Sequence, residues 1–395
     1  MRIERLQKDI LSSKICREVF RQIQDAYLVG GYIRDRLIGK ETRDYDFAIP
    51  STAMKEAIDA LSSVLGGKVI NFSRFNFIRI ALRNRITVDF TPCDDIEVDL
   101  ARRDFTINAI AFNPEKGIYD PHNGLKDLSD RLVRAVSDNS IKADPVRIIR
   151  AFRFKGLLGG EISDSTLEAI KRYKETLKDS PIERITLEFF KLLELESPEG
   201  LLGEMVDCGV TRVIFCHDIN DFDKIKKEIS YLSQNIKASR ELFHRELEEE
   251  IGQQLSRRGL LYLLILMKYS GDPGKTLLGL SGKILRRVGV FIEKSDDRCL
   301  IFHEDLESLY GCLRSLEPIV IEKIIYDRAF DIYAHFRRYQ EIIRRPPLSG
   351  RDISVVLKIP PCKRIAELKE MVNKGFFSGR LHSREEALEY LREII

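Results

Sequence analysis

The chain has 395 residues, of which 44% are hydrophobic and 32% are charged, so it can bury a sizeable core and is long enough for two or more domains. Its net charge is only +3 because 65 basic residues nearly balance 62 acidic ones, and nucleic-acid binding would therefore need a local basic surface. The longest apolar run, Leu260 to Met267, is too short to span a bilayer and predicts a buried helix.

The seven cysteines are scattered along the chain and form no C-x-x-C pair. This pattern predicts neither a disulfide framework nor a zinc site, and it favours a reducing cytoplasm. No signal peptide is expected, because residues 1–25 are charged throughout. Apolar positions in the same stretch recur at helical spacing, which predicts a packing helix ahead of the first strand.

Two acidic residues, Asp44 and Asp46, lie in a predicted strand within the segment Tyr27 to Ala48. Side chains alternate across a strand, so both carboxylates project from one side. A pair of hard oxygen ligands on a rigid strand suits Mg²⁺, which takes one or two carboxylates together with substrate phosphates. The pair predicts a magnesium site, although a D-x-D pattern alone is also frequent by chance.

A glycine pair, Gly30 and Gly31, comes shortly before these carboxylates. It follows a short apolar strand at residues 27–29 and precedes a helical turn that carries Arg34. Bare backbone N–H groups and the positive end of a helix suit a polyphosphate. Glycine pairs are also common turns, but the close succession of the two motifs favours a metal-dependent nucleotide site.

The next residues predict a helix from Thr52 to Leu65 with Ser51 as its N-cap, followed by three strands of a small mixed sheet. The predicted strands are Lys68–Phe72, Phe77–Leu82 and Ile86–Phe90. Asp89 on the third strand is a candidate third carboxylate that faces Asp44 and Asp46 from a neighbouring strand. The alternative is an ordinary aspartate on the surface of a strand.

A second informative segment reads DLARRDFTINAIAFNP and contains Arg103, Asp104 and Asn108. Basic pairs are usually solvated, but this pair stands downstream of Asp89 and directly upstream of an apolar run. The spacing of that run, from Phe105 to Ala111, predicts a helix.

The third segment reads ADPVRIIRAFRFKGLLG and predicts a helix that begins at Pro145, with Asp144 as its cap or first-turn residue. Arg147, Arg150 and Arg153 recur every third residue and stay near one face. Asp144 can share that face with Arg147. A carboxylate that only accepts, beside a guanidinium that only donates, forms a template favouring C and A over G and U. The alternative is an ordinary ion pair on a helix surface.

Residues 160 to 395 show a nearly continuous helical pattern, with a linker at 346–350 and a Ser383-x-x-Glu386 capping box. Basic residues gather around that linker, and they suit either an RNA-backbone surface or a solvated helical face. They are Arg337, Arg338, Arg344, Arg345, Arg351, Lys363 and Arg364.

Three stretches, in order, resemble the head and neck of class II, bacterial-type tRNA nucleotidyltransferases, the CCA-adding enzymes and their poly(A) polymerase relatives. They are LVGGYIRDRLIG with DYDFA, RRDFTINAIAF with YDPHNGLKDL, and DPVRIIRAFRF. The resemblance covers roughly residues 25 to 200. It implies an α+β fold, with a polymerase-β-like head followed by an all-α neck, body and tail. The expected bounds are 1–137 for the catalytic head, 138–200 for the base-reading neck, 201–345 for the body and 346–395 for a tRNA-binding tail.

The resemblance also implies a role for each candidate residue. The Mg²⁺ ligands would be Asp44 and Asp46, with Asp89 as a further catalytic candidate. The triphosphate would be held by Gly30, Gly31, Arg34 and Arg103. The region near the sugar would be oriented by Asp104 and Asn108. The base would be read by Asp144 and Arg147, supported by Arg150 and Arg153.

The activity that the resemblance implies is addition of nucleotides from CTP and ATP to the acceptor end of tRNA without a nucleic-acid template. The implied mechanism is two-metal phosphoryl transfer with Mg²⁺. Preorganised charge would supply most of the catalysis.

Two departures from the family pattern bear on the product. Ala143 stands where the neck motif Glu-Asp-x-x-Arg usually has Glu, and only the short stretch Pro92 to Asp99 fills the place of a longer flexible loop. That loop is thought to permit the switch from C to A addition, so its loss resembles the CC-adding subgroup. We therefore predict addition of two C residues, with the terminal A left to a separate A-adding enzyme in the same cell. The alternatives are A addition, full CCA addition, a poly(A) polymerase and an inactive RNA-binding relative.

Overall fold

The computed structural model describes residues 2–72, 76–216, 222–270 and 272–394. The chain divides into two compact units, Met1–Ile214 and Phe215–Ile395. The head and neck segments of the sequence both fall in the first unit. The finer division into four domains stays a prediction.

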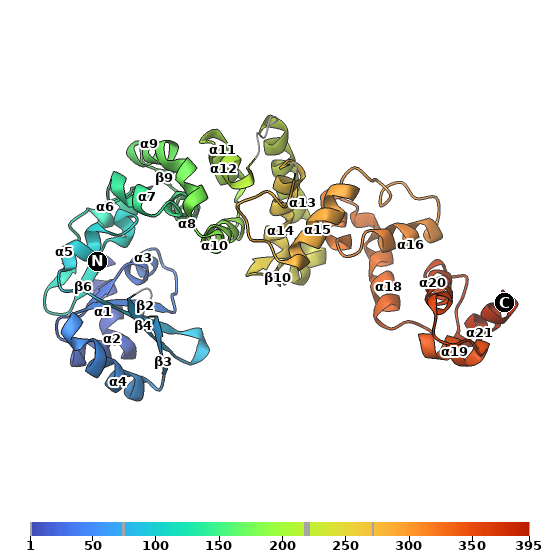
Figure 1. Cartoon of the computed structure of the whole chain (residues 1–395), viewed down its shortest axis with the longest axis horizontal. Coiled ribbons are helices and arrows are strands. Elements are labelled where there is room, and N and C mark those ends of the chain that lie inside the picture. The colour runs from blue at the N-terminus through green and yellow to red at the C-terminus, as the bar shows by residue number, and fades with distance from the viewer. Residues whose placement is uncertain (1, 73–75, 217–221, 271, 395) are drawn as a thin grey trace. The chain divides into compact units, whose positions relative to one another are not determined.

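The first unit is built on a seven-stranded sheet with strand order β3-β4-β5-β2-β1-β6-β7 (Figure 1). The strands are β1 (Tyr27–Val29), β2 (Asp44–Ile49), β3 (Lys68–Phe72), β4 (Phe77–Ala81), β5 (Thr87–Pro92), β6 (Ala111–Asn113) and β7 (Gly117–Tyr119). Strands β2 and β5 run parallel, and the other neighbours are antiparallel. The predicted small mixed sheet is confirmed, and with it the α+β class.

Helices surround the sheet and continue beyond it. They are α1 (Arg2–Ser12), α2 (Lys14–Gln22), α3 (Gly31–Leu37), α4 (Met54–Leu65), α5 (Ile96–Ala101), α6 (Gly124–Ser129), α7 (Asp138–Ala143), α8 (Arg147–Leu158), α9 (Asp164–Tyr173), α10 (Ile182–Leu193), α11 (Glu199–Asp207) and α12 (Val210–Phe215). The short strands β8 (Leu132–Val133) and β9 (Glu161–Ile162) pair in parallel among them. Helix α8 packs against α10.

The core of the sheet explains to which face of β2 the two carboxylates point. Buried Leu28 on β1, Phe47 on β2 and Phe90 on β5 pack in one cluster with residues of α1, α2 and α4. Because side chains alternate along a strand, Asp44 and Asp46 point to the opposite face from Phe47. Burial of one face therefore fixes the direction of both carboxylates.

Two predicted helices near the N-terminus differ from the structure. The predicted helix over residues 1–25 is two helices, because Ser13 interrupts it and its hydroxyl accepts a hydrogen bond from the Cys16 N–H, which caps α2. Ser51 is not the N-cap of α4. Its N–H and its hydroxyl both donate to the Asp94 carboxylate, at 3.0 Å each, and α4 begins only at Met54 after a 3₁₀ turn, Ser51–Ala53.

The predicted helix over Phe105 to Ala111 is also wrong. Only Thr106–Asn108 forms a single 3₁₀ turn, and the chain then enters β6, which pairs with β1. The apolar side chains of this run are buried, with Phe105 and Ile107 both at 0% exposure. A short run that is buried on all sides has no periodicity that separates helix from strand, which is why the pattern misled.

In its described residues, 215–216, 222–270 and 272–394, the second unit consists of helices and their connections apart from a small hairpin of β10 (Glu250–Gly252) and β11 (Leu255–Ser256). Its helices are α13 (Phe222–Leu247), α14 (Arg257–Lys268), α15 (Gly282–Lys294), α16 (Leu306–Ser315), α17 (Val320–Asp327), α18 (Tyr333–Arg344), α19 (Gly350–Leu357), α20 (Lys363–Ser378) and α21 (Arg384–Glu393). Helix α14 is buried over almost its whole length, as its apolar sequence predicts. None of the helices in the described ranges is long and apolar enough to cross a membrane.

The capping box predicted for α21 is half formed. The Ser383 hydroxyl accepts from the Glu386 N–H at 3.1 Å, but the Glu386 carboxylate accepts from the N–H of His382 instead of that of Ser383. Ser383 is therefore the N-cap, as predicted.

One pair of cysteines contradicts the expectation from the sequence. Cys299 and Cys312 are joined by a disulfide, with their Cα atoms 5.8 Å apart. Cys312 lies on α16 and Cys299 in the segment before it. The fold brings the two together, and their spacing matches no motif that would predict it.

Candidate functional site

Asp44 and Asp46 occupy the first and third positions of β2, which lies between β1 and β5 in the sheet. Asp46 stands opposite Val29 of β1 and Asp89 of β5. The Asp44 carboxylate is exposed and accepts a hydrogen bond from the Thr87 hydroxyl at 2.7 Å. Hydrogen bonding on both sides of β2 gives the two carboxylates a rigid base, as the sequence predicts.

The charge around Asp46 fits a bound cation. The pKa of the Asp46 carboxyl is raised to about 6, and burial is the largest cause. The negative charges of Asp89 and Asp44 add to this rise, whereas the positive charges of Arg103 and Arg79 oppose it. The ionised pair is therefore under-neutralised by the protein, and a divalent cation would relieve that repulsion.

The two carboxylates are hard oxygen ligands of the kind that a divalent cation takes. Across the described parts of the chain, no group of three or more His, Cys, Asp or Glu side chains could hold a metal ion. Two carboxylates would leave several ligand positions for water and substrate phosphate, which is how Mg²⁺ is usually bound.

Asp89 is engaged on both oxygens by Arg79 of β4. Arg79 Nε donates to Oδ1 at 2.7 Å and Nη2 to Oδ2 at 2.6 Å. The two residues are register partners on antiparallel strands, so their side chains share a face. The sequence showed both strands but not the register that pairs them, and Arg79 was missed. A catalytic role for Asp89 stays a prediction.

The glycine pair and Arg103 come together, as predicted. Gly30 has φ of +73°, and a Cβ atom built there would lie 2.6 Å from Arg103 Nη1. The positive φ favours glycine at this position, and a side chain there would displace the Arg103 guanidinium. At Gly31 the same construction gives 3.4 Å to Arg34 Nη2. The start of α3 is thus flanked by two guanidinium groups.

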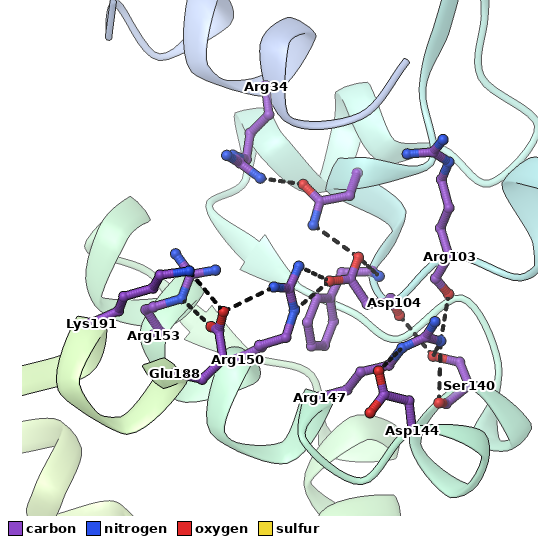
Figure 2. A network of polar contacts seen from close by, with 12 residues as sticks. Arg34, Arg103, Asp104, Ser140, Asp144, Arg147, Arg150, Arg153, Glu188 and Lys191 are labelled. Atoms are coloured by element: carbon purple, nitrogen blue, oxygen red, sulfur yellow. Dashed lines mark hydrogen bonds and ion pairs between the residues drawn. The ribbon is translucent and has the colours of Figure 1, made fainter. Parts of the chain in front are cut away.

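Arg34 is not exposed toward solvent but begins a buried network (Figure 2). Its Nη1 donates to Asn108 Oδ1, and Asn108 Nδ2 donates to Asp104 Oδ1 at 2.9 Å. Arg34 Nε also donates to Asp35 at 2.9 Å. The network joins α3 to the 3₁₀ turn at Thr106–Asn108.

The network continues from Asp104 into the neck helices. Arg150 of α8 donates to Asp104 Oδ2 through Nε at 2.9 Å and Nη2 at 2.6 Å, and through Nη1 to Glu188 of α10 at 3.3 Å. Glu188 also accepts from Arg153 at 2.9 Å and from Lys191 at 3.1 Å. Figure 2 shows Glu188 and Asp104 on either side of Arg150. Arg150 of α8 thus connects Asp104 of the head segment with Glu188 of the neck helix α10.

These contacts set the charge of Asp104. Burial alone would raise the pKa of its carboxyl, but the charge of Arg150 and hydrogen bonds from Asn108, Arg150 and the Phe105 N–H outweigh burial and lower the pKa to about 2. The Phe154 ring lies beneath three guanidinium groups, 4.8 Å from that of Arg34, 5.3 Å from that of Arg150 and 4.3 Å from that of Arg153. Glu188 was missed in the sequence, where only its i,i+3 spacing to Lys191 hinted at an ion pair.

The expected start of the neck helix at Pro145 is wrong. Asp144 is the C-cap of α7, and α8 begins at Arg147 with Val146 as its N-cap. The Asp144 carbonyl accepts from the Arg147 N–H at 3.0 Å, but the Asp144 side chain caps no helix. Its Oδ2 accepts from Arg184 Nη2 of α10 at 2.7 Å instead. The sequence reasoning did not identify Arg184.

Asp144 and Arg147 do lie together, with Asp144 Oδ2 3.8 Å from Arg147 Nε. The terminal nitrogens of Arg147 are engaged elsewhere. Nη2 donates to the Arg102 carbonyl at 2.9 Å, and Nη1 donates to the Arg103 carbonyl at 3.1 Å and to Ser140. Arg147 is therefore fixed against the backbone of the basic pair, with Nε turned toward Asp144.

A cavity of about 1090 Å³ lies elsewhere in the first unit, between α1, the end of α3, α6 and the end of α8. None of the predicted site residues is among those that line it.

The chain matches two known families in the expected order. Residues 26–93 and 69–134 match the family described as "Poly A polymerase head domain", and residues 160–221 match "Probable RNA and SrmB- binding site of polymerase A". A CC-adding tRNA nucleotidyltransferase of Geobacter sulfurreducens is 28% identical over 393 residues, covering 93% of this chain and 91% of the relative. A protein of the same name from Synechocystis is 27% identical over 395 residues and covers 93% of each chain.

The fold is shared with a solved structure as well. A CCA-adding enzyme of Thermotoga maritima, complexed with tRNA, matches with a TM-score of 0.76 at 22% identity, over 99% of this chain and 98% of that one. Fold and family matches together define a nucleotidyltransferase head followed by helices. The chain is therefore similar to poly(A) polymerases in its head domain and to tRNA nucleotidyltransferases over 93% of its length. Enzymes of these families typically use divalent metal ions.

Proposed function

We propose that this enzyme adds two C residues from CTP to the 3′ end of tRNA without a nucleic-acid template. The observation that carries the proposal is the convergence of three groups within the first unit: the carboxylates Asp44 and Asp46, the Gly30–Arg103 contact and the Asp144–Arg147 pair. A carboxylate pair, a phosphate-binding guanidinium and a base-sized template are the parts that nucleotidyl transfer needs.

In this proposal the tRNA 3′-hydroxyl attacks the α-phosphorus of CTP in line, a phosphodiester forms, and pyrophosphate leaves. Asp44 and Asp46 would hold Mg²⁺, which would activate the hydroxyl and neutralise charge on the phosphates. Arg103, lying over Gly30, contributes positive charge where the triphosphate would bind. Arg34 supports this region from the buried side through Asn108.

The choice of CC addition rests on the short connection after β5. Strand β5 ends at Pro92 and α5 begins at Ile96, which leaves Cys93 to Asp95 between them. Two relatives that align over 93% of the chain are named CC-adding enzymes, which supports the same product. An A-adding enzyme with an equally short connection is the alternative.

Three further predictions belong to the same proposal. The basic residues around the linker at 346–350 would bind the tRNA backbone, and a separate A-adding enzyme would complete the tRNA. We place the reaction in the cytoplasm because its substrate is tRNA. The cysteine pattern no longer supports this placement, since Cys299 and Cys312 form a disulfide.

A direct assay tests the product. The purified chain is incubated with Mg²⁺, one nucleotide at a time, and tRNA ending at the discriminator base, at C or at CC. We expect C to be added to the first two tRNAs and A to none. Addition of A to the CC-ending tRNA would contradict the CC-only product, and no addition to any tRNA would favour the inactive RNA-binding relative.

Base selection depends on Asp144 in this proposal. In Asp144→Ala, we expect the preference for CTP over UTP to fall about tenfold or more, because the acceptor for the cytosine amino group is lost. The measurement is the ratio of kcat/KM for the two nucleotides. Asp138→Ala is the matched control, since Asp138 also pairs with an arginine, Arg172, but is 59% exposed. An unchanged ratio in Asp144→Ala would show that Asp144 does not read the base.

A further inference from the structure

A buried carboxylate to which the sequence assigned no role lies between the two arginines of the basic pair. Asp99 on α5 is 3% exposed. Its Oδ1 accepts from Arg102 Nε at 3.1 Å and Nη2 at 2.5 Å. Its Oδ2 accepts from Arg103 Nε at 2.9 Å and lies 2.8 Å from Arg103 Nη2. Each oxygen is thus held by the edge of one guanidinium group.

This pairing decides which part of Arg103 faces the glycine pair. With Nε and Nη2 turned to Asp99, Nη1 is the nitrogen that lies at Gly30, 2.6 Å from the place of a Cβ there. A rotation of the Arg103 side chain would move Nη1 away from Gly30.

The backbone of the basic pair is fixed independently. The carbonyls of Arg102 and Arg103 accept from the two terminal nitrogens of Arg147, at 2.9 and 3.1 Å. Figure 2 shows Arg103 reaching away from the carbonyl that Arg147 holds. Arg147 therefore holds the backbone of Arg103, and Asp99 holds its side chain.

The short connection before α5, residues 93–95, is hydrogen-bonded to residues at or just after the end of β2. The Cys93 N–H donates to the Ile49 carbonyl at 2.7 Å, and Asp94 accepts from the N–H and the hydroxyl of Ser51. Asp95 then caps α5 by accepting from the Glu97 N–H at 2.8 Å. The connection thus places the helix that carries Asp99 at a fixed position beside β2.

We propose that Asp99 is a positioning residue for nucleotide binding: it holds Arg103 so that Nη1 faces the triphosphate over the glycine pair. This inference rests on the proposed function. A pre-positioned arginine loses less side-chain freedom when phosphate binds, so Asp99 strengthens binding without touching the nucleotide. The pyrophosphate leaving group would bind to the same guanidinium, and its affinity depends on Asp99 in the same way.

The test compares Asp99→Asn with Arg102→Ala. For Asp99→Asn we expect the KM for CTP and the inhibition constant of pyrophosphate to rise together by about fivefold to tenfold, the cost of ordering one long side chain. The kcat changes less, because Asp44 and Asp46 are untouched. Arg102 is 59% exposed and binds the other oxygen of Asp99, so Arg102→Ala leaves both constants within about twofold. Circular dichroism checks that each variant is folded.

A second variant and a check on the wild-type enzyme separate the possible explanations. If Asp99→Asn does not fold, Asp99→Glu keeps the charge but displaces the carboxylate by one methylene, and it must raise both constants. Unchanged constants in a folded Asp99 variant, or an equal rise in Arg102→Ala, overturn the inference. Failure of the proposed function has a different signature, because the wild-type enzyme itself would then incorporate no C into tRNA.

Discussion

Replacing Asp46 by Asn is expected to reduce C incorporation by about a thousandfold or more, because one of two carboxylates that would bind Mg²⁺ is lost. Asn has the same shape, and β2 remains held by β1 and β5. The measurement is single-turnover incorporation of labelled CTP into tRNA. Binding of tRNA, followed by gel shift, should stay close to that of the wild type.

The stability of this variant separates lost chemistry from lost folding. The pKa of Asp46 is raised to about 6 from an ordinary value of 3.8, so the folded state disfavours its charged form. The contribution of Asp46 to the free energy of unfolding is therefore less favourable at pH 7 than at pH 4, by up to about 3 kcal/mol. Asp46→Asn should unfold at an equal or higher temperature than the wild type.

Asp59→Asn is the control for this substitution, because Asp59 is exposed on α4 and belongs to no predicted site. It should leave incorporation unchanged. Transfer in Asp46→Asn within about tenfold of the wild-type rate would show that Asp46 is not an essential metal ligand.

The parts of the site that the sequence predicted are those set by neighbours along the chain. Asp44 and Asp46 share a face because a strand alternates, and the break between β1 and α3 favours glycine at position 30, where φ is +73°. The bounds of β1 and β3 match the predicted ranges for the same reason. Local spacing carries this information without reference to the rest of the fold.

The partners of the charged residues could not be predicted, because they come from distant parts of the chain. Arg150 pairs with Asp104, 46 positions away, and Asp144 pairs with Arg184, 40 positions away. With 65 basic and 62 acidic residues, spacing alone cannot select one partner. The same holds for Asp89 and Arg79, whose pairing requires the strand register. The helix predicted from Phe105 to Ala111 was wrong for another reason: burial on all sides removed the periodicity of this run.

These pairings change what each arginine is expected to do. Of the five arginines assigned to the triphosphate or the base, only Arg103 and Arg34 have terminal nitrogens close to the glycine pair, Arg103 at Gly30 and Arg34 at Gly31. Arg34, Arg150 and Arg153 surround Phe154 and hold Asn108, Asp104 and Glu188. Their primary effect is to fix the head against the neck helix α8, which carries Arg147.

Arg150→Ala is therefore expected to act on stability and activity together. It leaves Asp104 buried without its ion pair, which costs about 3–5 kcal/mol in the free energy of unfolding of the first unit. Incorporation of C should fall by about tenfold to a hundredfold in the protein that remains folded, because Asp104 and Asn108 lose their orientation. Urea unfolding followed by circular dichroism gives the first value, and single-turnover incorporation gives the second.

A double-mutant cycle shows whether the pair itself is responsible. Asp104→Asn removes the charge that Arg150 neutralises, so Asp104→Asn with Arg150→Ala should lose less stability than the two single variants added together. Arg172→Ala is the matched control, since Arg172 forms an exposed ion pair with Asp138, and its unfolding midpoint should not change. Additive losses in the double variant would show that the Asp104–Arg150 contact contributes nothing of its own.

The pH dependence of unfolding gives an independent check on the same contact. The pKa of Asp104 is lowered to about 2 from 3.8, so its ionised form stabilises the fold above about pH 4, and this contribution is lost as the pH falls toward 2. In the wild type the lowered pKa corresponds to a contribution of roughly 2 kcal/mol to the free energy of unfolding. In Arg150→Ala the pKa of Asp104 returns toward or above its ordinary value, so this acid-dependent loss should shrink or disappear. An Arg150→Ala variant that still loses the wild-type increment between pH 4 and pH 2 would show that another carboxylate is responsible.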